Sequence, residues 1–129
     1  MVKSGEPEKG ARRFEELWVW QQARELVQDI YRDLCSRSGS KDFGFRDQLQ
    51  RARVSVMNNI AEGFERSTDV EFAWFLDVAR GSCGEVRSMY YAAEDLGYVN
   101  SEVADTRRSK ARQISAGLAS LASHLRKKA

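Results

Sequence analysis

The side chains that most often carry out catalysis are sparse in this chain of 129 residues. Its one histidine is His124, whereas a di-iron site in a helical bundle needs inward glutamates and repeated Glu-x-x-His spacing. The residue three positions before His124 is Leu121, so this motif is absent. The two cysteines, Cys35 and Cys83, are too far apart for the clustered ligands of a zinc site. The sequence therefore predicts no metal ion and no other cofactor.

A catalytic nucleophile of the Cys-His or Ser-His-Asp type would have to recruit the same histidine. His124 falls off the apolar seam, the line of apolar residues spaced three and four apart that faces the core of a helical bundle. A solvated histidine is the simpler interpretation of such a position near a basic C-terminus. We therefore expect a protein that is not an enzyme. The alternative, an enzyme with its site in the bundle core, predicts a bound metal or cofactor.

Two groups of basic residues suit a different chemistry, which is contact with phosphate. Arg108 and Arg112 are four apart and share a helix face, and Lys127 belongs to the basic run before the C-terminus. Arg46 and Arg53 lie seven apart on an earlier helical stretch. Phosphate contacts dominate nucleic-acid affinity, so these five residues are candidate nucleic-acid contacts. The alternative is an ordinary solvated face, because the net charge is only +2 and acidic residues are abundant elsewhere.

A polar string interrupts one of the apolar helical patterns, and it consists of Asn59, Ile60, Ala61, Glu62 and Gly63. Asparagine is poor in helix interiors, yet the spacing places Asn59 on the apolar seam. The simpler interpretation is a buried polar network that fixes the helix register, as a seam asparagine does in coiled coils. The alternative is a polar site for a ligand or nucleic acid.

Four helical stretches position these residues. Apolar residues recur three and four apart from about Phe14 to Arg37 and from about Phe45 to Gly63. The third stretch begins at a capping box of Thr68 and Glu71 and ends near Gly97, which can take a left-handed conformation. The fourth is capped by Asn100 or Ser101 and continues to about Leu125. Its first half is weaker, because Arg107 falls on the seam.

Composition also supports one helical domain. Pro7 is the only proline, whereas an all-β domain of this length usually has more Gly and Pro at its turns. Four helices joined by short connections favour an all-α, antiparallel up-down four-helix bundle over residues 14–129. Residues 1–13 are polar and aperiodic, and we expect a flexible N-terminal leader there.

The sequence also indicates where the protein resides. No apolar run is long enough to cross a bilayer, and residues 1–13 lack the apolar stretch of a signal peptide. Cys35 and Cys83 fall in apolar-periodic stretches, which suggests reduced thiols and not a disulfide framework. We therefore expect a cytoplasmic protein with no membrane partner.

Apolar residues that lie off the seams indicate contacts between copies of the chain. Val70, Trp74 and Val78 fall opposite the seam of the third helical stretch, and Trp18 lies off the seam of the first. Exposed apolar stripes mark interfaces, and tryptophan is enriched at interface cores. We therefore expect a homo-oligomer with these four residues at its interface. The alternative is that Trp18 and Trp74 cover loops or the bundle ends within one chain.

The run Gly81-Ser82-Cys83-Gly84 is unusual in the middle of a helix, where each glycine costs about 1 kcal/mol relative to alanine. Small residues let another backbone approach closely, and we expect close helix packing here. A phosphate-binding loop is the alternative, but no strand precedes it and the apolar spacing continues through it.

Several separated motifs, taken together and in order, carry a family resemblance. They include Phe14-Glu15-Glu16-Leu17, Val19-Trp20-Gln21, Asn59-Ile60-Ala61-Glu62-Gly63, Ala79-Arg80-Gly81-Ser82 and Asp95-Leu96-Gly97-Tyr98. The chain resembles, over about residues 14–125, the bacterial four-helix-bundle family named after proteins encoded in intervening sequences of 23S ribosomal RNA genes. That family commonly has proline and alanine before the Asn-Ile-Ala-Glu-Gly motif, where this chain has Met57 and Asn58. We therefore expect a less kinked second helix.

The resemblance implies a non-enzymatic bundle that assembles into a homopentameric ring. It also implies kinship with the accessory protein of diversity-generating retroelements, a basic pentamer that binds a reverse transcriptase and nucleic acid. The implied partners are further copies of the chain and an RNA or a nucleic-acid-processing protein. Two functions thus stay open: an oligomeric scaffold that binds RNA or protein, or a protein-only adaptor whose partner docks on an apolar face without nucleic acid.

Overall fold

The computed structural model describes residues 10–35, 39 and 41–129. They form η1 (Phe14–Glu16), α1 (Trp18–Leu34), α2 (Phe43–Phe64), α3 (Asp69–Asp95) and α4 (Ser101–Lys128), of which η1 is a 3-10 turn. Neither a strand nor a helix long and apolar enough to span a membrane occurs among the described residues. The predicted all-α class with four helices is confirmed, while residues 1–9 of the expected leader lie outside the described part of the chain.

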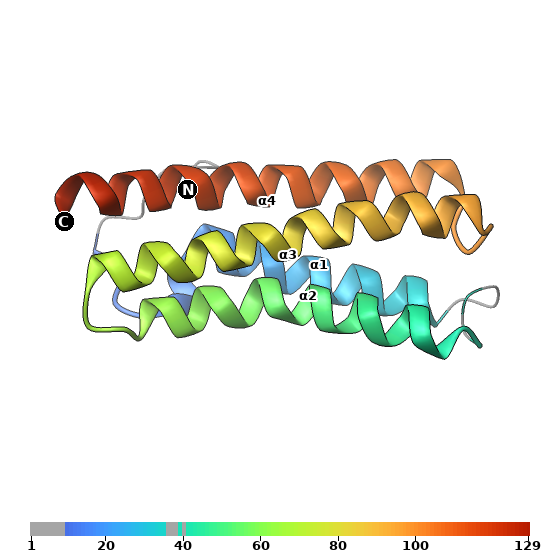
Figure 1. The fold of residues 1–129 in the computed structure, drawn as a ribbon, viewed down its shortest axis with the longest axis horizontal. Helices are drawn as coiled ribbons and strands as arrows, with labels where there is room; N and C mark the ends of the chain where they lie inside the picture. The colour runs from blue at the N-terminus through green and yellow to red at the C-terminus, as the bar shows by residue number, and fades with distance from the viewer. Residues whose placement is uncertain (1–9, 36–38, 40) are drawn as a thin grey trace.

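The four helices run side by side along the long axis of the molecule (Figure 1). The α1–α2 and α3–α4 connections lie at one end, here called the Tyr98 end, and the α2–α3 connection lies at the other, here called the Phe64 end. Each helix packs against the next helix in the chain, and α1 also packs against α4. The helices therefore enclose one core, with α2 and α4 diagonally across it.

The core follows the apolar seams. The predicted seam of α3 is buried from Leu76 to Ala93, and Phe72 at its start is half-buried. Large side chains with almost no exposed surface come from all four helices, and they are Leu26, Ile30, Leu49, Val56, Ile60, Leu76, Cys83, Val86, Tyr90, Ile114 and Leu118. Full burial of one large apolar side chain contributes about 1.5–3 kcal/mol. Burial along the seams is therefore the main force that holds the helices together.

The helix ends carry the caps that the sequence predicts. The hydroxyl oxygen of Thr68 accepts a hydrogen bond from the backbone N–H of Glu71 at 3.1 Å, which is one half of the predicted capping box. The Glu71 carboxylate accepts from the Thr68 hydroxyl and not from the Thr68 backbone N–H that the other half requires. Asn100 accepts from the backbone N–H of Val103 at 2.8 Å. Gly97 has φ +76°, so the left-handed turn predicted after α3 is confirmed. The Thr68 and Asn100 caps satisfy N–H groups at the start of a helix, whereas the turn at Gly97 satisfies carbonyl groups at the end of α3.

The first helix is shorter than predicted. Phe14–Glu16 form the 3-10 turn, and Leu17 has an extended backbone (φ −74°, ψ 130°) before α1 begins at Trp18. Leu17 is buried, so the break in the helix directs this apolar side chain into the core. The described part of α1 ends at Leu34, and the predicted end at Arg37 lies outside the described residues.

Candidate functional site

Arg108, a predicted nucleic-acid contact, lies inside the bundle. Its side chain is 7% exposed, and its guanidinium donates to Glu94 Oε1 at 3.0 Å and to Asp105 Oδ1 at 2.5 Å. It also donates to the backbone carbonyl of Tyr90, and it lies 4.1 Å from the ring centroid of Tyr91. The contacts with Tyr90, Tyr91 and Glu94 join α4 to α3, while Asp105 pairs with Arg108 within α4. The prediction of a phosphate contact at Arg108 is not supported by this placement.

Arg53 is engaged in a similar way. It is 6% exposed, and its Nη1 donates to the backbone carbonyl of Val27 at 2.6 Å. Its guanidinium lies 5.5 Å from the ring centroid of Tyr31, and burial lowers the pKa of Arg53. Arg53 thus links α2 to α1. Its burial also removes it from the surface that a phosphate would reach.

The other three predicted contacts do not form one basic surface. Arg112 and Lys127 are exposed on α4, and neither forms an ion pair within the described part of the chain. Arg46 is half-buried on α2 and lies 5.8 Å from the ring centroid of Phe43. Because α2 and α4 are diagonally opposed, Arg46 is separated from the two α4 cations.

A partly buried ionic network at the Tyr98 end explains the arginine on the seam of the fourth helical stretch. Arg107 makes two hydrogen bonds with Asp33, from Nε to Oδ2 at 2.7 Å and from Nη2 to Oδ1 at 3.0 Å. The Tyr90 hydroxyl donates to the same carboxylate at 2.5 Å, and burial raises the pKa of Tyr90. The network joins α1, α3 and α4. In the sequence, the position of Arg107 on the apolar seam indicated that a partner must exist. The spacing of residues could not identify that partner as Asp33.

The polar string on α2 forms a network with α3. Asn59 Nδ2 donates to the backbone carbonyl of Ser55 at 2.8 Å and to its hydroxyl at 2.9 Å. The Ser82 hydroxyl on α3 donates to the Ser55 hydroxyl at 2.8 Å. Ile60 is fully buried, while Glu62 is exposed and pairs with Arg66. The buried network of the simpler interpretation is present only in part, because Asn59 is half-buried and bonds within α2, while the Ser82–Ser55 bond joins α2 to α3.

Gly63 completes the string by allowing α2 to approach α3. A Cβ atom at Gly63 would lie 2.7 Å from Phe75 Cβ and 3.2 Å from the Phe72 carbonyl oxygen. No side chain fits at that distance without a shift of the backbone. Gly63 is therefore required by packing within the chain.

An open polar groove of about 720 Å³ runs between α2 and α3. Asn59 and Ser55 line it together with side chains of both charges, and its full lining is Gln48, Arg51, Ala52, Val54, Ser55, Asn58, Asn59, Glu85, Ser88 and Met89. The groove contains amide, hydroxyl and charged groups but no pair of groups arranged for acid–base catalysis.

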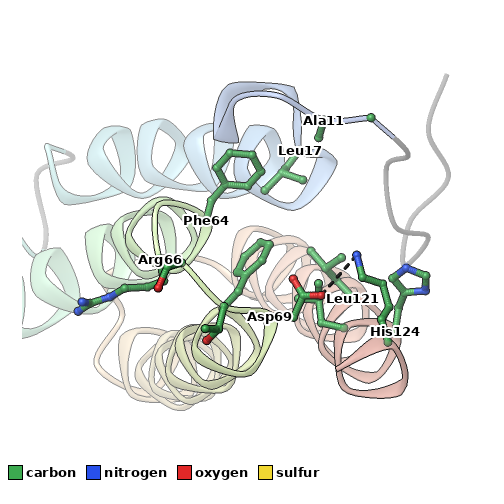
Figure 2. A pocket seen from close by; sticks show the side chains of 13 residues that line it. Ala11, Leu17, Phe64, Arg66, Asp69, Leu121 and His124 are labelled. Carbon is green, nitrogen blue, oxygen red and sulfur yellow. Dashed lines mark ion pairs between the residues drawn. The ribbon is translucent and has the colours of Figure 1, made fainter.

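A second recess, of about 620 Å³, lies at the Phe64 end between the α2–α3 connection, the residues that flank η1 and the last turns of α4 (Figure 2). Its apolar lining is Leu17, Phe64, Phe72, Leu121 and Leu125. His124 lies at its rim, where Asp69 pairs with Lys128 at 3.5 Å. The Arg66 side chain extends away from it in Figure 2. The recess suits an apolar group.

Catalytic chemistry finds no support in the described residues. No group of three or more His, Cys, Asp or Glu side chains among them could hold a metal ion. Burial raises the pKa of the Cys83 thiol to about 12, so Cys83 is protonated and unreactive at neutral pH. His124 is exposed, as expected for a solvated histidine.

The outer face of α3 carries the predicted apolar stripe. Val70 is 63% exposed and Trp74 58% exposed, and Val78 is half-buried. The Trp74 ring meets Phe75 edge to face, with centroids 4.9 Å apart. Trp18, in contrast, is half-buried and packs against the core, so it does not extend this stripe. Large exposed apolar side chains gathered on one helix face favour an interface.

Two glycines on α3 have no packing reason within the chain. A Cβ atom at Gly81 or Gly84 would meet no atom within 4 Å. The close helix packing predicted for them is therefore not found inside the subunit.

Comparison with known proteins gives one family. The model of the family described as 23S rRNA-intervening sequence protein matches residues 15–120. No curated protein matches the chain significantly. The family description names an intervening sequence of 23S rRNA and states no activity. The kinship with the retroelement accessory protein stays a prediction.

Proposed function

The chain belongs to the 23S rRNA-intervening sequence protein family, and from this premise we propose that it is a non-enzymatic, cytoplasmic subunit of a homo-oligomeric scaffold. Each subunit would be an antiparallel up-down bundle, and the assembly would be a pentameric ring that binds RNA or protein. The observation that carries the proposal is the apolar stripe of Val70, Trp74 and Val78 on the outer face of α3. Burial of an exposed tryptophan between subunits is a common source of interface energy.

Light scattering at micromolar concentration tests the assembly. We expect a particle mass close to five times the 14.7 kDa of one chain. Another multiple would keep the oligomer and correct the subunit number. A monomer at 14.7 kDa would contradict the proposal.

RNA binding would depend on the exposed cations of α4. The basic last turn, which contains Lys127, is available there, whereas Arg53 and Arg108 are engaged inside the bundle. A pentamer would also carry five times the +2 charge of one chain, which strengthens its attraction for phosphate. We therefore propose that any RNA contact is electrostatic and salt-sensitive.

Retention on RNA at low salt tests this contact. Lys127→Glu should bind more weakly than wild type. The matched control is Lys41→Glu, which makes the same charge change at an exposed position before α2. Absence of RNA binding by the wild-type protein at low salt would contradict this function.

A protein-only adaptor is the second candidate function, and the apolar recess at the Phe64 end favours it. Its lining of Leu17, Phe64 and Phe72 would accept an apolar side chain of a partner protein. A partner captured after nuclease treatment would support the adaptor. Ser67→Trp, at an exposed position on the rim, should then reduce capture by filling the recess. Loss of every captured protein with nuclease would support the RNA scaffold.

A further inference from the structure

We propose that neighbouring copies join head to tail, with the outer face of α3 in one copy packed antiparallel against the outer face of α4 in the next. This inference rests on the proposed homo-oligomer and identifies its contact surfaces. The α3 stripe, as used here, is Val70, Trp74, Val78, Gly81, Glu85 and Ser88. The α4 stripe is Lys127, Ser123, Ala119, Ala116, Arg112 and Ser109.

Both stripes are open to solvent in the subunit. All residues of the α3 stripe are exposed except Val78, which is half-buried. In the α4 stripe, Ala119 and Ser109 are half-buried and the other four are exposed. Residues spaced three and four apart lie on one side of a helix, so each stripe is a continuous ridge.

The two stripes match in residue size when α3 and α4 run in opposite directions. From Val70 towards the C-terminus of α3, successive stripe residues are four, four, three, four and three positions apart. From Lys127 towards the N-terminus of α4, the intervals between stripe residues are the same. This register places Trp74 opposite Ser123 and Val78 opposite Ala119. Large side chains of one helix therefore meet small side chains of the other, as ridges fit grooves.

The same register explains the glycine on the outer face of α3. Gly81 falls opposite Ala116, and a Cβ atom at Gly81 would meet nothing within its own subunit. Glycine opposite alanine lets two helices approach closely. The close packing expected from this glycine then occurs between copies of the chain.

Charges also match in the antiparallel register. Glu85 falls opposite Arg112, and both are exposed without an ion pair in the described part of the subunit. Lys127 falls at the edge of the contact, beside the acidic first turn of α3, which contains Glu71. A parallel arrangement would lose this match. From the N-terminus to the C-terminus of α4, the intervals between stripe residues are three, four, three, four and four, which differ from those of α3.

A two-fold contact of α3 with α3 fits less well. It would place the carboxylate of Glu85 opposite the Trp74 ring, and the α3 stripe contains no cation to pair with it. Because the α3 and α4 stripes differ, their contact is heterologous, and repetition of it closes a ring or continues as a filament. The partner in this inference is therefore a second copy of the same chain.

Two variants separate the two surfaces. Trp74→Glu disables the α3 stripe and Ala116→Arg disables the α4 stripe, both at exposed positions that the fold tolerates. Each variant alone should be a monomer by light scattering. Mixed together they should form a 1:1 dimer, because one intact junction remains. Leu96→Glu and Gln113→Arg, at exposed positions outside the stripes, are the matched controls and should leave the oligomer intact.

A charge exchange tests the register itself. Glu85→Arg and Arg112→Glu should each weaken subunit association about tenfold, and the double variant should restore it to within about threefold of wild type. Circular dichroism should show the same helical content and thermal midpoint for all variants.

The outcomes distinguish this inference from the proposed function. An oligomeric wild type whose Ala116→Arg variant keeps its mass would overturn the α3–α4 contact and leave the homo-oligomer standing. Loss of assembly with no dimer on mixing at any concentration reached would also overturn it. A monomeric wild type would overturn the proposed homo-oligomer and this contact together.

Discussion

The two ends of the bundle are held together by different interactions. At the Tyr98 end, carboxylates accept hydrogen bonds from groups on other elements, Asp33 from Tyr90 and Arg107 and Asp42 from Tyr98. At the Phe64 end, Gly63 allows close approach, and aromatic and aliphatic side chains surround a recess. Hydrogen bonds depend on direction, whereas apolar burial does not. One end therefore specifies which helices meet, while the other end leaves an apolar recess open.

Replacement of Asp33 should have the largest effect on stability. Asp33→Ala removes the acceptor of Arg107 and Tyr90 together and leaves a largely buried guanidinium without its carboxylate. Loss of one partner of a buried pair costs about 3–5 kcal/mol. Because Arg107 keeps some exposure, we expect a loss of about 3 kcal/mol in urea denaturation.

Asp29→Ala is the matched control at the same end. Asp29 lies 3.9 Å from Arg107 and is more exposed than Asp33, so its loss should cost less than about 1 kcal/mol. Equal effects of the two variants would show that the Tyr98 end does not depend on the directional bonds to Asp33.

Gly63→Ala should give the next largest effect, at the other end. The added methyl group would lie 2.7 Å from Phe75 Cβ, so α2 and α3 must separate. Overpacking of this kind typically costs about 1–3 kcal/mol, and we expect about 2 kcal/mol in the same denaturation experiment.

Gly84→Ala should change the stability in the opposite direction to Gly63→Ala. A methyl group there would meet nothing within 4 Å, so the better helix propensity of alanine should stabilise the isolated subunit by about 1 kcal/mol. Stabilisation by Gly63→Ala as well would mean that the Phe64 end is loosely packed.

Acid should weaken the Tyr98 end by a smaller amount. The Tyr98 hydroxyl, at 2.6 Å, and the Phe45 N–H hold the pKa of Asp42 below its ordinary value. The unfolded chain therefore binds a proton first, at a pKa of about 3.9. The contribution of this bond is complete well above that pH and is lost as the pH falls through the lower folded pKa.

Tyr98→Phe keeps the ring and removes the bond. The stability difference between wild type and this variant should be larger at pH 7 than at pH 3 in urea denaturation. A difference that is the same at both pH values would exclude Asp42 as the acid-sensitive group.

The smallest effect is expected at the mouth of the recess. Asp69 and Lys128 are 3.5 Å apart and about half-exposed, and such pairs contribute little. Lys128→Ala should reduce stability by no more than about 0.5 kcal/mol, and high salt should abolish the difference. A larger loss would show that the Phe64 end also depends on a directional ionic contact.

The spacing of residues along the sequence was enough to predict the apolar seams and the caps of the helices. The seam from Leu76 to Ala93 and the caps at Thr68 and Asn100 depend on residues near each other in sequence, so a single helix reveals them. The break at Leu17 was not predicted, because burial of this side chain depends on the assembled core.

The candidate site was predicted only in part. Trp74 and Val70 are exposed as expected, because a face opposite a seam points outward in any bundle. Arg53 and Arg108 lie beside the seam, where a long side chain can turn inward and find partners on another helix. Sequence spacing cannot distinguish such an arginine from a solvated one, since the partner is set by tertiary packing.

The carboxylate of Asp33 also constrains the order in which the fold can be completed. Its partners Tyr90 and Arg107 are 57 and 74 residues further along the chain. During synthesis from the N-terminus, α1 and α2 therefore emerge long before either group exists. Contacts of such long sequence separation slow folding, because much of the chain must be ordered before they form. The last turn of α1 is thus locked into place only after the first half of α4 has been made.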